Sequence, residues 1–228
     1  AEAPFCRLPA GLAELAGSLH AMPGGRQRIA IVAGVASLPA DAAPDVMRGE
    51  ETQVLGALAA MRLSDGLFVL PGTHSKWVTV VDGRITAFKT YMTGEVFAAM
   101  KDHTILGRLM ADGGTGGEGF VAGIAASGKM RHGGDLLSAL FSVRTLGLFE
   151  RLPGDALADY LSGLLIGAEV RAAVAAQEGP VTIVASPALT ARYDEAVGQL
   201  GVTADSAPRD CVAIGLAAVA RAAGWGEP

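Results

Sequence analysis

Three short apolar runs between residues 67 and 91 constrain the fold of this chain more than any other feature. They occupy residues 67–71, 76–82 and 84–91. Each run is rich in Val, Ile, Thr and aromatic residues, which favour β-strands. Asp82-Gly83 separates the second run from the third and is a typical two-residue hairpin turn. The pattern therefore predicts an antiparallel meander of three strands, whose first turn begins at Pro71-Gly72.

Helix and strand patterns alternate before and after this meander. Apolar residues recur at helical spacing after Glu50, and Asp65-Gly66 ends that element. Further helices are expected at 10–22, 93–100, 120–127, 134–141, 155–176, 189–201 and 211–223, and further strands at 28–35, 180–186 and around 201–204. Because helical segments separate the strands, the pattern predicts a layered α/β fold with helices flanking a mixed sheet.

The composition narrows the class of protein. The chain has 228 residues, of which 50% are hydrophobic and 18% are charged, as in a compact enzyme. Its net charge of −5 offers no basic surface for nucleic acid, and no run reaches the roughly 18 apolar residues of a membrane span. Cys6 and Cys211 lie far apart, and sparse cysteine suits a reducing compartment. We therefore expect a cytoplasmic protein without nucleic-acid or membrane partners.

The segment Arg48-Gly49-Glu50-Glu51 places two carboxylates at the expected start of a helix. The positive end of the helix dipole favours an ionised carboxylate there, and such a group beside a substrate hydroxyl is a general base. Arg48 could hold an acidic substrate through two hydrogen bonds. The plain alternative is that Glu50 and Glu51 are ordinary acids of a first helical turn. The sequence also leaves open which of the two would be the base.

Two turns carry the residue types that bind nucleotides. Gly72 and Thr73, in the first turn of the meander, offer backbone N–H groups and a hydroxyl to phosphate oxygens, and His74 and Lys76 can add donors. Residues 186–189 lie between an expected strand and an expected helix, where open α/β sheets bind ligands, and an adenosine could lie there. The plain alternatives are an ordinary hairpin and a tight strand-to-helix turn.

The order of these segments resembles the actin-like, hexokinase-type ATPase superfamily, which has a ribonuclease H-like fold. In its sugar kinases a Gly-Asp segment carries the base, and Gly49-Glu50 is similar to it, with Glu in the Asp place. More narrowly, the chain resembles the 2-dehydro-3-deoxygalactonokinase (2-oxo-3-deoxygalactonate kinase) family. The segments that carry this resemblance are VMRGEETQ-LGA (46–57), PGTHSKWV (71–78), TYMTGE (90–95), SGLLIGAEV (162–170) and LTARY (189–193).

This resemblance implies a sugar-acid kinase that transfers the γ-phosphoryl group of ATP to the 6-hydroxyl of 2-dehydro-3-deoxy-D-galactonate, with Mg²⁺ on the nucleotide phosphates. Glu50 would be the base. The phosphate loop would comprise Gly72, Thr73 and His74, with Lys76 beside it, and the adenosine turn Ser186, Pro187, Ala188 and Leu189. Contact of Arg48 and Glu51 with the sugar acid is our own chemical inference. No side chain is assigned to a metal.

The resemblance also suggests a division into two lobes. Residues 1–66 would be the remainder of an N-terminal lobe, leading to the catalytic Glu segment, and residues 67–228 a C-terminal nucleotide-binding lobe. A homo-oligomer is left open. The first phosphate motif of the family, of the Asp-Trp-Gly type, is not found in the sequence as given, so the N-terminal lobe is expected to be incomplete. We therefore expect this chain alone to be a poor kinase.

A second departure concerns the adenosine turn, where Ser186-Pro187 replaces the Gly-Thr of relatives, and Pro187 removes one backbone donor. Two alternatives to the kinase for galactonate follow. One is a non-catalytic sugar-acid-binding protein on the kinase scaffold, because a fold does not specify an activity. The other is a kinase for the epimeric acid 2-dehydro-3-deoxygluconate, since nothing in the sequence indicates the stereochemistry of the substrate.

Overall fold

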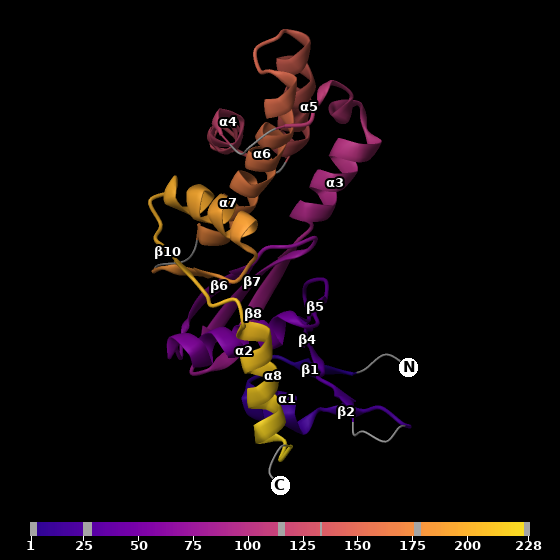
Figure 1. The fold of residues 1–228 in the computed structure, drawn as a ribbon, viewed down its shortest axis with the longest axis vertical. Coiled ribbons are helices and arrows are strands. Elements are labelled where there is room, and N and C mark those ends of the chain that lie inside the picture. The colour runs from indigo at the N-terminus through magenta and orange to yellow at the C-terminus, as the bar shows by residue number, and fades with distance from the viewer. Residues whose placement is uncertain (1–3, 25–28, 114–116, 133, 176–178, 226–228) are drawn as a thin grey trace.

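A computed structural model describes residues 4–24, 29–113, 117–132, 134–175 and 179–225 (Figure 1). Its main sheet has five strands in the order β10-β9-β6-β7-β8. Their bounds are β6 (Gly66–Leu70), β7 (Ser75–Val81), β8 (Arg84–Tyr91), β9 (Val181–Ile183) and β10 (Ala204–Ser206). Strands β6, β7 and β8 run antiparallel, whereas β9 and β10 run parallel to β6. The predicted meander is therefore confirmed.

The second turn of the meander has the backbone that its residues predicted. Asp82 and Gly83 both have positive φ angles, of 52° and 70°. Two adjacent left-handed residues make the type I′ turn, whose twist matches that of the flanking strands. Val81 then pairs with Arg84, which sets the register of β7 on β8.

A smaller sheet lies beside the first and is formed by the N-terminal part of the chain. Its strands are β1 (Phe5–Arg7), β4 (Gly34–Ser37) and β5 (Asp45–Met47), in the order β1-β4-β5. Strand β4 runs parallel to β1 and antiparallel to β5. The short strands β2 (His20–Ala21) and β3 (Ala30–Ile31) form a separate hairpin. Strand β5 leads directly into the segment that carries Arg48 and Glu50.

Two predictions in this region were wrong in extent. The single strand expected at 28–35 is two strands, β3 and β4, with different partners, and residue 28 lies outside the described residues. The helix expected at 10–22 is only α1 (Leu12–Gly17), because residues 20 and 21 pair with β3 instead. An apolar run predicts a strand, but it does not indicate where the strand changes partner.

Helices cover both faces of the five-stranded sheet (Figure 1). On one face, α2 (Glu50–Met61) and α8 (Cys211–Ala222) share a core with Phe68, Val78 and Phe88. On the other face, α4 (Glu118–Ser127), α6 (Gly154–Val174) and α7 (Pro187–Gly198) pack on Val69, Trp77 and Ile183. Trp77 is thus a core residue, as expected. None of the described helices is long and apolar enough to cross a bilayer.

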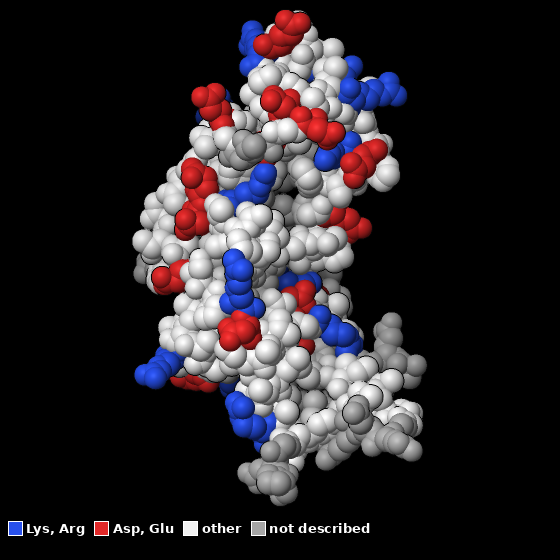
Figure 2. Space-filling model, in the orientation of Figure 1, with Lys and Arg blue, Asp and Glu red and all other residues white. Residues whose placement is uncertain are grey.

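A helical arm extends beyond the sheet at the end opposite the chain termini (Figure 1). It contains α3 (Thr93–His103), the 3-10 helix η1 (Ile105–Leu109), α5 (Gly134–Leu148) and the first turns of α6, around a third apolar core. On the face shown in Figure 2, Lys and Arg side chains are interspersed with Asp and Glu side chains.

The division of the chain into lobes at residues 66 and 67 stays a prediction. Helix α8, from the C-terminal end, packs on α2 and α1.

Candidate active site

The start of α2 is built around Gly49. This residue has φ +103°, a left-handed conformation that favours glycine, and it turns the chain from β5 into the helix. Its N–H donates to Oε2 of Glu51 at 2.7 Å, and the N–H of Arg48 donates to Oε2 of Glu50 at 3.0 Å. Thr52 Oγ1 donates to the Gly49 carbonyl oxygen at 2.6 Å. The two carboxylates therefore cap the backbone that precedes them.

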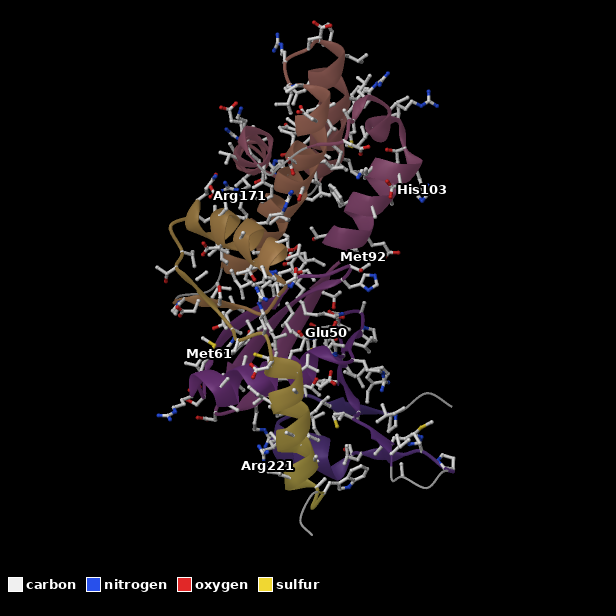
Figure 3. The ribbon with its side chains drawn as sticks, viewed as in Figure 1. Glu50, Met61, Met92, His103, Arg171 and Arg221 are labelled. Carbon is white, nitrogen blue, oxygen red and sulfur yellow. The ribbon has the colours of Figure 1, made fainter. Side chains whose placement is uncertain are left out.

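The two adjacent carboxylates have different environments. Glu51 is only 1% exposed, whereas Glu50 is partly exposed, near the middle of the molecule (Figure 3). Burial above all, and then the charge of Glu50, raise the pKa of Glu51 to about 7, against the lowering effect of its backbone hydrogen bonds and the charge of Arg48. The exposed Arg48 guanidinium lies 4.3 Å from the ring centroid of Phe5. Glu50 is thus the carboxylate that a substrate can reach.

The turn between β6 and β7 is held by the start of α3. The N–H of Glu95 donates to the Thr73 carbonyl oxygen at 3.0 Å, and Glu95 Oε2 lies 2.5 Å from Nε2 of His74. A Cβ at Gly94 would lie 2.4 Å from the Gly72 carbonyl oxygen, so only glycine permits this approach. The side of the turn formed by Gly72, Thr73 and His74 remains exposed. Its backbone is therefore fixed while its surface can meet a ligand.

Lys76 lies beyond this turn and points elsewhere. Its side chain is buried, and its Nζ donates to the Val46 carbonyl oxygen at 2.9 Å and to Thr90 Oγ1 at 2.8 Å. Two of its three donors are thus used within the protein. A phosphate contact of Lys76 stays a prediction.

The predicted adenosine turn follows β9 and begins α7. Ser186 is the N-cap residue of α7 and Pro187 is the first helical residue. Proline suits this position because the N–H it lacks would have no partner within the helix. The side chains of Ser186, Pro187 and Ala188 are exposed, and Leu189 is partly buried. The departure from Gly-Thr thus makes a regular helix start.

Segments far apart in the sequence meet around one cavity of about 440 Å³. Its lining includes Gln53 of α2, Pro71 beside the phosphate loop, Ser186 and Pro187, and Arg209 and Cys211 at the start of α8. Gln53 lies three residues after Glu50, on the same side of α2. A second cavity of about 210 Å³ is lined by Gly72, Thr93, Gly94 and Arg192, and the two cavities share Leu189. The phosphate loop and the adenosine turn therefore border the same space.

Sequence reasoning missed several of these lining residues. Gln53 could have been found from its helical spacing to Glu50. Arg192 and Arg209 have no local signal, because their places depend on how α7 and α8 pack on the rest of the protein.

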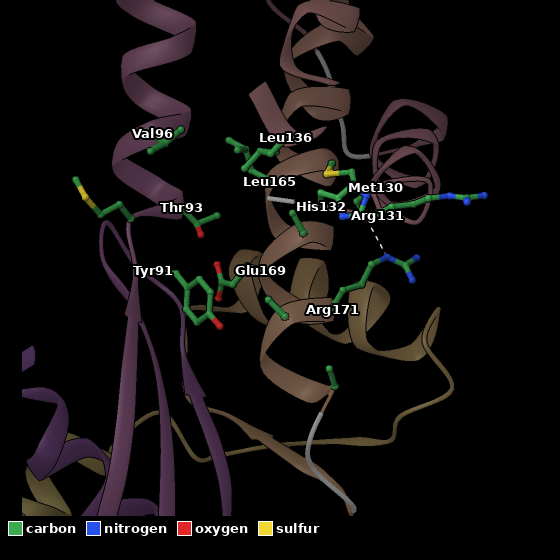
Figure 4. Close-up of a pocket in the computed structure, with 15 residues that line it drawn as sticks. Tyr91, Thr93, Val96, Met130, Arg131, His132, Leu136, Leu165, Glu169 and Arg171 are labelled. Atoms are coloured by element: carbon green, nitrogen blue, oxygen red, sulfur yellow. Dashed lines mark hydrogen bonds between the residues drawn. The ribbon is translucent and has the colours of Figure 1, made fainter. Parts of the chain in front are cut away.

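A larger cavity of about 730 Å³ lies between α3, the end of α4, and α6 (Figure 4). The predicted site residues are not part of its lining. Glu169 reaches its wall from α6, beside Tyr91 (Figure 4). This buried carboxylate accepts hydrogen bonds from Ser75 Oγ at 2.6 Å, Trp77 Nε1 at 2.7 Å and the Tyr193 hydroxyl at 2.9 Å. Three donors satisfy it, so we assign Glu169 to the core rather than to catalysis.

Known proteins are similar to this chain over most of its length. A family model described as 2-keto-3-deoxy-galactonokinase matches residues 1–219. The chain is 41% identical to a probable 2-dehydro-3-deoxygalactonokinase of Rhizobium meliloti (strain 1021), over 97% of this chain and 73% of that protein. It is 38% identical to the 2-dehydro-3-deoxygalactonokinase of Escherichia coli (strain K12), over 69% of this chain and 53% of that protein.

A solved structure agrees with these relatives. The crystal structure of a putative 2-dehydro-3-deoxygalactonokinase protein from Sinorhizobium meliloti superposes with a TM-score of 0.88 and 39% identity, covering 97% of this chain and 74% of that one. The predicted α/β fold, a mixed sheet with flanking helices, is confirmed, and its assignment to the actin-like ATPases stays a prediction. The chain belongs to the 2-keto-3-deoxy-galactonokinase family, a family of ATP-dependent carbohydrate kinases.

Proposed function

We propose that this protein transfers the γ-phosphoryl group of ATP to the 6-hydroxyl of 2-dehydro-3-deoxy-D-galactonate. The names of the relatives support this substrate. The observation that carries the proposal is the pair of cavities that share Leu189. The helix that begins at Glu50 and the adenosine turn line the one of about 440 Å³, through Gln53 and Ser186, and Gly72 of the phosphate loop lines the one of about 210 Å³. These are the three parts that a sugar kinase of this fold requires.

In the proposed mechanism Glu50 is the general base, because it is partly exposed while Glu51 is buried. Its carboxylate takes the proton of the attacking hydroxyl. Arg48 pairs with the carboxylate of the sugar acid. Glu51 does not contact the substrate directly in this mechanism, and instead holds the N–H of Gly49, which orients the turn.

The exposed turn of Gly72, Thr73 and His74 suits the phosphates of ATP, and the helix start at Ser186, Pro187, Ala188 and Leu189 suits its adenosine. Mg²⁺ bound with the nucleotide would offset the phosphate charge during transfer. The loop fits a polyphosphate because its backbone is held from behind by Glu95 and its outer side is exposed.

The test is turnover by the full-length protein of ATP with 2-dehydro-3-deoxy-D-galactonate and, in parallel, with its gluconate epimer. We expect turnover of the galactonate compound, with the phosphate placed on the 6-position by NMR of the product. Turnover of the gluconate epimer alone would overturn the assignment of the galactonate compound as the substrate. Turnover of neither by a folded protein would overturn the kinase and favour a sugar-acid-binding protein.

The role of Glu50 is tested in the same assay. Glu50→Gln should lower kcat by about 10²–10⁴, the usual contribution of a general base. Asp41→Asn, which changes an exposed carboxylate of the preceding loop, is the matched control and should leave kcat unchanged. Near-normal kcat in Glu50→Gln would remove Glu50 from the mechanism.

A further inference from the structure

A continuous chain of polar side chains joins the small sheet to the five-stranded sheet. Lys76 of β7 donates to Thr90 Oγ1 of β8 at 2.8 Å and to the Val46 carbonyl oxygen of β5 at 2.9 Å. Thr90 in turn donates to Asp45 of β5, through Oγ1 at 2.6 Å and through its N–H at 2.8 Å. Lys76 and Thr90 are opposite each other in the β7–β8 pair. Three hydrogen bonds thus link β5 to the meander, and a fourth joins Lys76 to Thr90 within it.

The position of Lys76 calls for an explanation. Its side chain is only 6% exposed, and burying an ammonium group is costly unless it is well paired. An uncharged methionine side chain of similar length would fill the same space without the desolvation cost of an ammonium group. The two acceptors of the ammonium group are the Val46 carbonyl and the Thr90 hydroxyl, and the Asp45 carboxylate lies one hydrogen bond further on. The buried ammonium group of Lys76 therefore links β7 to β5.

Strand β5 ends three residues before α2 begins at Glu50, so its position affects that of Glu50 directly. Among the described strands, β5 forms ladder hydrogen bonds with β4 alone. Val46 precedes Gly49 by three residues, and Lys76 follows the phosphate loop by two. The linked residues are therefore close in sequence to both parts of the candidate active site, the start of α2 and the phosphate loop.

We propose that Lys76, Thr90 and Asp45 form a positioning set that fixes the distance between Glu50 and the phosphate loop. The inference rests on the proposed function, in which Glu50 is the base and the loop holds the phosphates. Lys76 then acts through β5 and not by contact with ATP. This places a residue beside the phosphate loop in a role distinct from phosphate binding.

The test compares variants of the full-length protein that separate positioning from phosphate contact. Lys76→Met removes the ammonium group and Thr90→Val removes the hydroxyl, while Thr90→Ser keeps the hydroxyl and is the matched control. We expect kcat to fall by about 10- to 100-fold in both Lys76→Met and Thr90→Val, as for a small misplacement of reacting groups. The ATP affinity measured by calorimetry should change less than about threefold, and Thr90→Ser should behave as wild type.

The double variant and hydrogen exchange complete the test. Because both changes break one network, Lys76→Met with Thr90→Val should be no worse than the worse single variant. Amide exchange of residues 45–52 should be faster in both single variants, whether or not the protein is active. Loss of ATP affinity in Lys76→Met but not in Thr90→Val would identify a phosphate ligand and overturn the proposal.

A failure of the proposed kinase function can be distinguished from a failure of the positioning set. If wild type turns over no sugar acid, the kinase proposal fails, and the exchange measurement alone decides whether the network holds β5. Unchanged exchange in Lys76→Met and Thr90→Val would overturn the positioning set independently of any activity.

Discussion

Two neighbouring residues of the same type, Glu50 and Glu51, differ because a helix turns by about 100° per residue. Glu50 stays partly exposed and accepts only a backbone N–H among the hydrogen bonds found in the described residues. Glu51 points inward, where burial raises its pKa to about 7. At the scale of one residue, the direction in which a side chain points thus separates the proposed base from a buried acid.

This difference predicts a pH dependence of stability. Below pH 4.5 Glu51 is protonated in both the folded and the unfolded chain, and between pH 4.5 and 7 the folded chain keeps a proton that the unfolded chain has released. The free energy of unfolding should therefore fall as pH rises through this interval, by about 2–3 kcal/mol. Glu51→Gln lacks this loss, so its stability relative to wild type should be greater at pH 8 than at pH 5.

Urea denaturation of both proteins at pH 5 and pH 8 measures this difference. Glu118→Gln, which changes an exposed first-turn glutamate of α4, is the control and should shift stability by less than about 0.5 kcal/mol at either pH. The same stability difference between Glu51→Gln and wild type at both pH values would contradict the assignment of Glu51 as a buried acid.

At the scale of elements, the crossing of α2 and α8 is unusually close. A Cβ at Gly56 would lie 1.8 Å from the Cys211 carbonyl oxygen, and a Cβ at Gly215 would lie 1.9 Å from that of Thr52. Each helix thus presents a glycine to the backbone of the other. Because α2 begins at Glu50 and α8 begins at the shared cavity, this contact sets the position of both.

Gly56→Ala should therefore destabilise the protein, by about 1–3 kcal/mol as for an overpacked core, because the obstacle is backbone and cannot rotate away. Gly198→Ala is the control, since a Cβ there meets nothing within 4 Å and the residue ends α7. That change should be neutral or slightly stabilising. Chemical denaturation compares the two variants, and equal stability would show that α2 and α8 can separate without cost.

At the scale of the whole molecule, the candidate site is formed by contact between distant parts of the chain. Gln53, Pro71, Ser186 and Arg209 line one cavity although they come from different elements. A ligand in that cavity therefore stabilises the folded state as a whole, because the unfolded chain holds no such site.

Mg²⁺ with ADP at about 100 times its dissociation constant should stabilise the full-length protein by about 2.7 kcal/mol, which raises Tm by about 5–10 °C for a protein of this size. Leu189→Glu, which places a negative charge where the two cavities meet, should abolish most of this shift. Thermal melts with and without nucleotide make the measurement. An unchanged Tm in wild type, or an equal shift of Tm in Leu189→Glu, would show that the nucleotide does not bind in this cavity.

The sequence by itself determined the α/β class, the meander of 67–91, the helix that begins at Glu50 and the family of the chain. These follow from alternation, helical spacing and turn residues such as Asp82-Gly83, all of which act between near neighbours. The limit of prediction from such local patterns is visible at residues 28–35. One apolar run there forms two strands, because β3 and β4 have different partners.

Only the tertiary structure decided which carboxylate is reachable, where Lys76 points and which residues join the cavity. Lys76 donates a hydrogen bond to a carbonyl 30 residues away, and Arg209 and Gln53 line the same cavity. Such contacts depend on how sheets and helices pack, and burial is the main cause of the raised pKa of Glu51. Local patterns carry no information on these distances, because the same pattern can be packed against many partners.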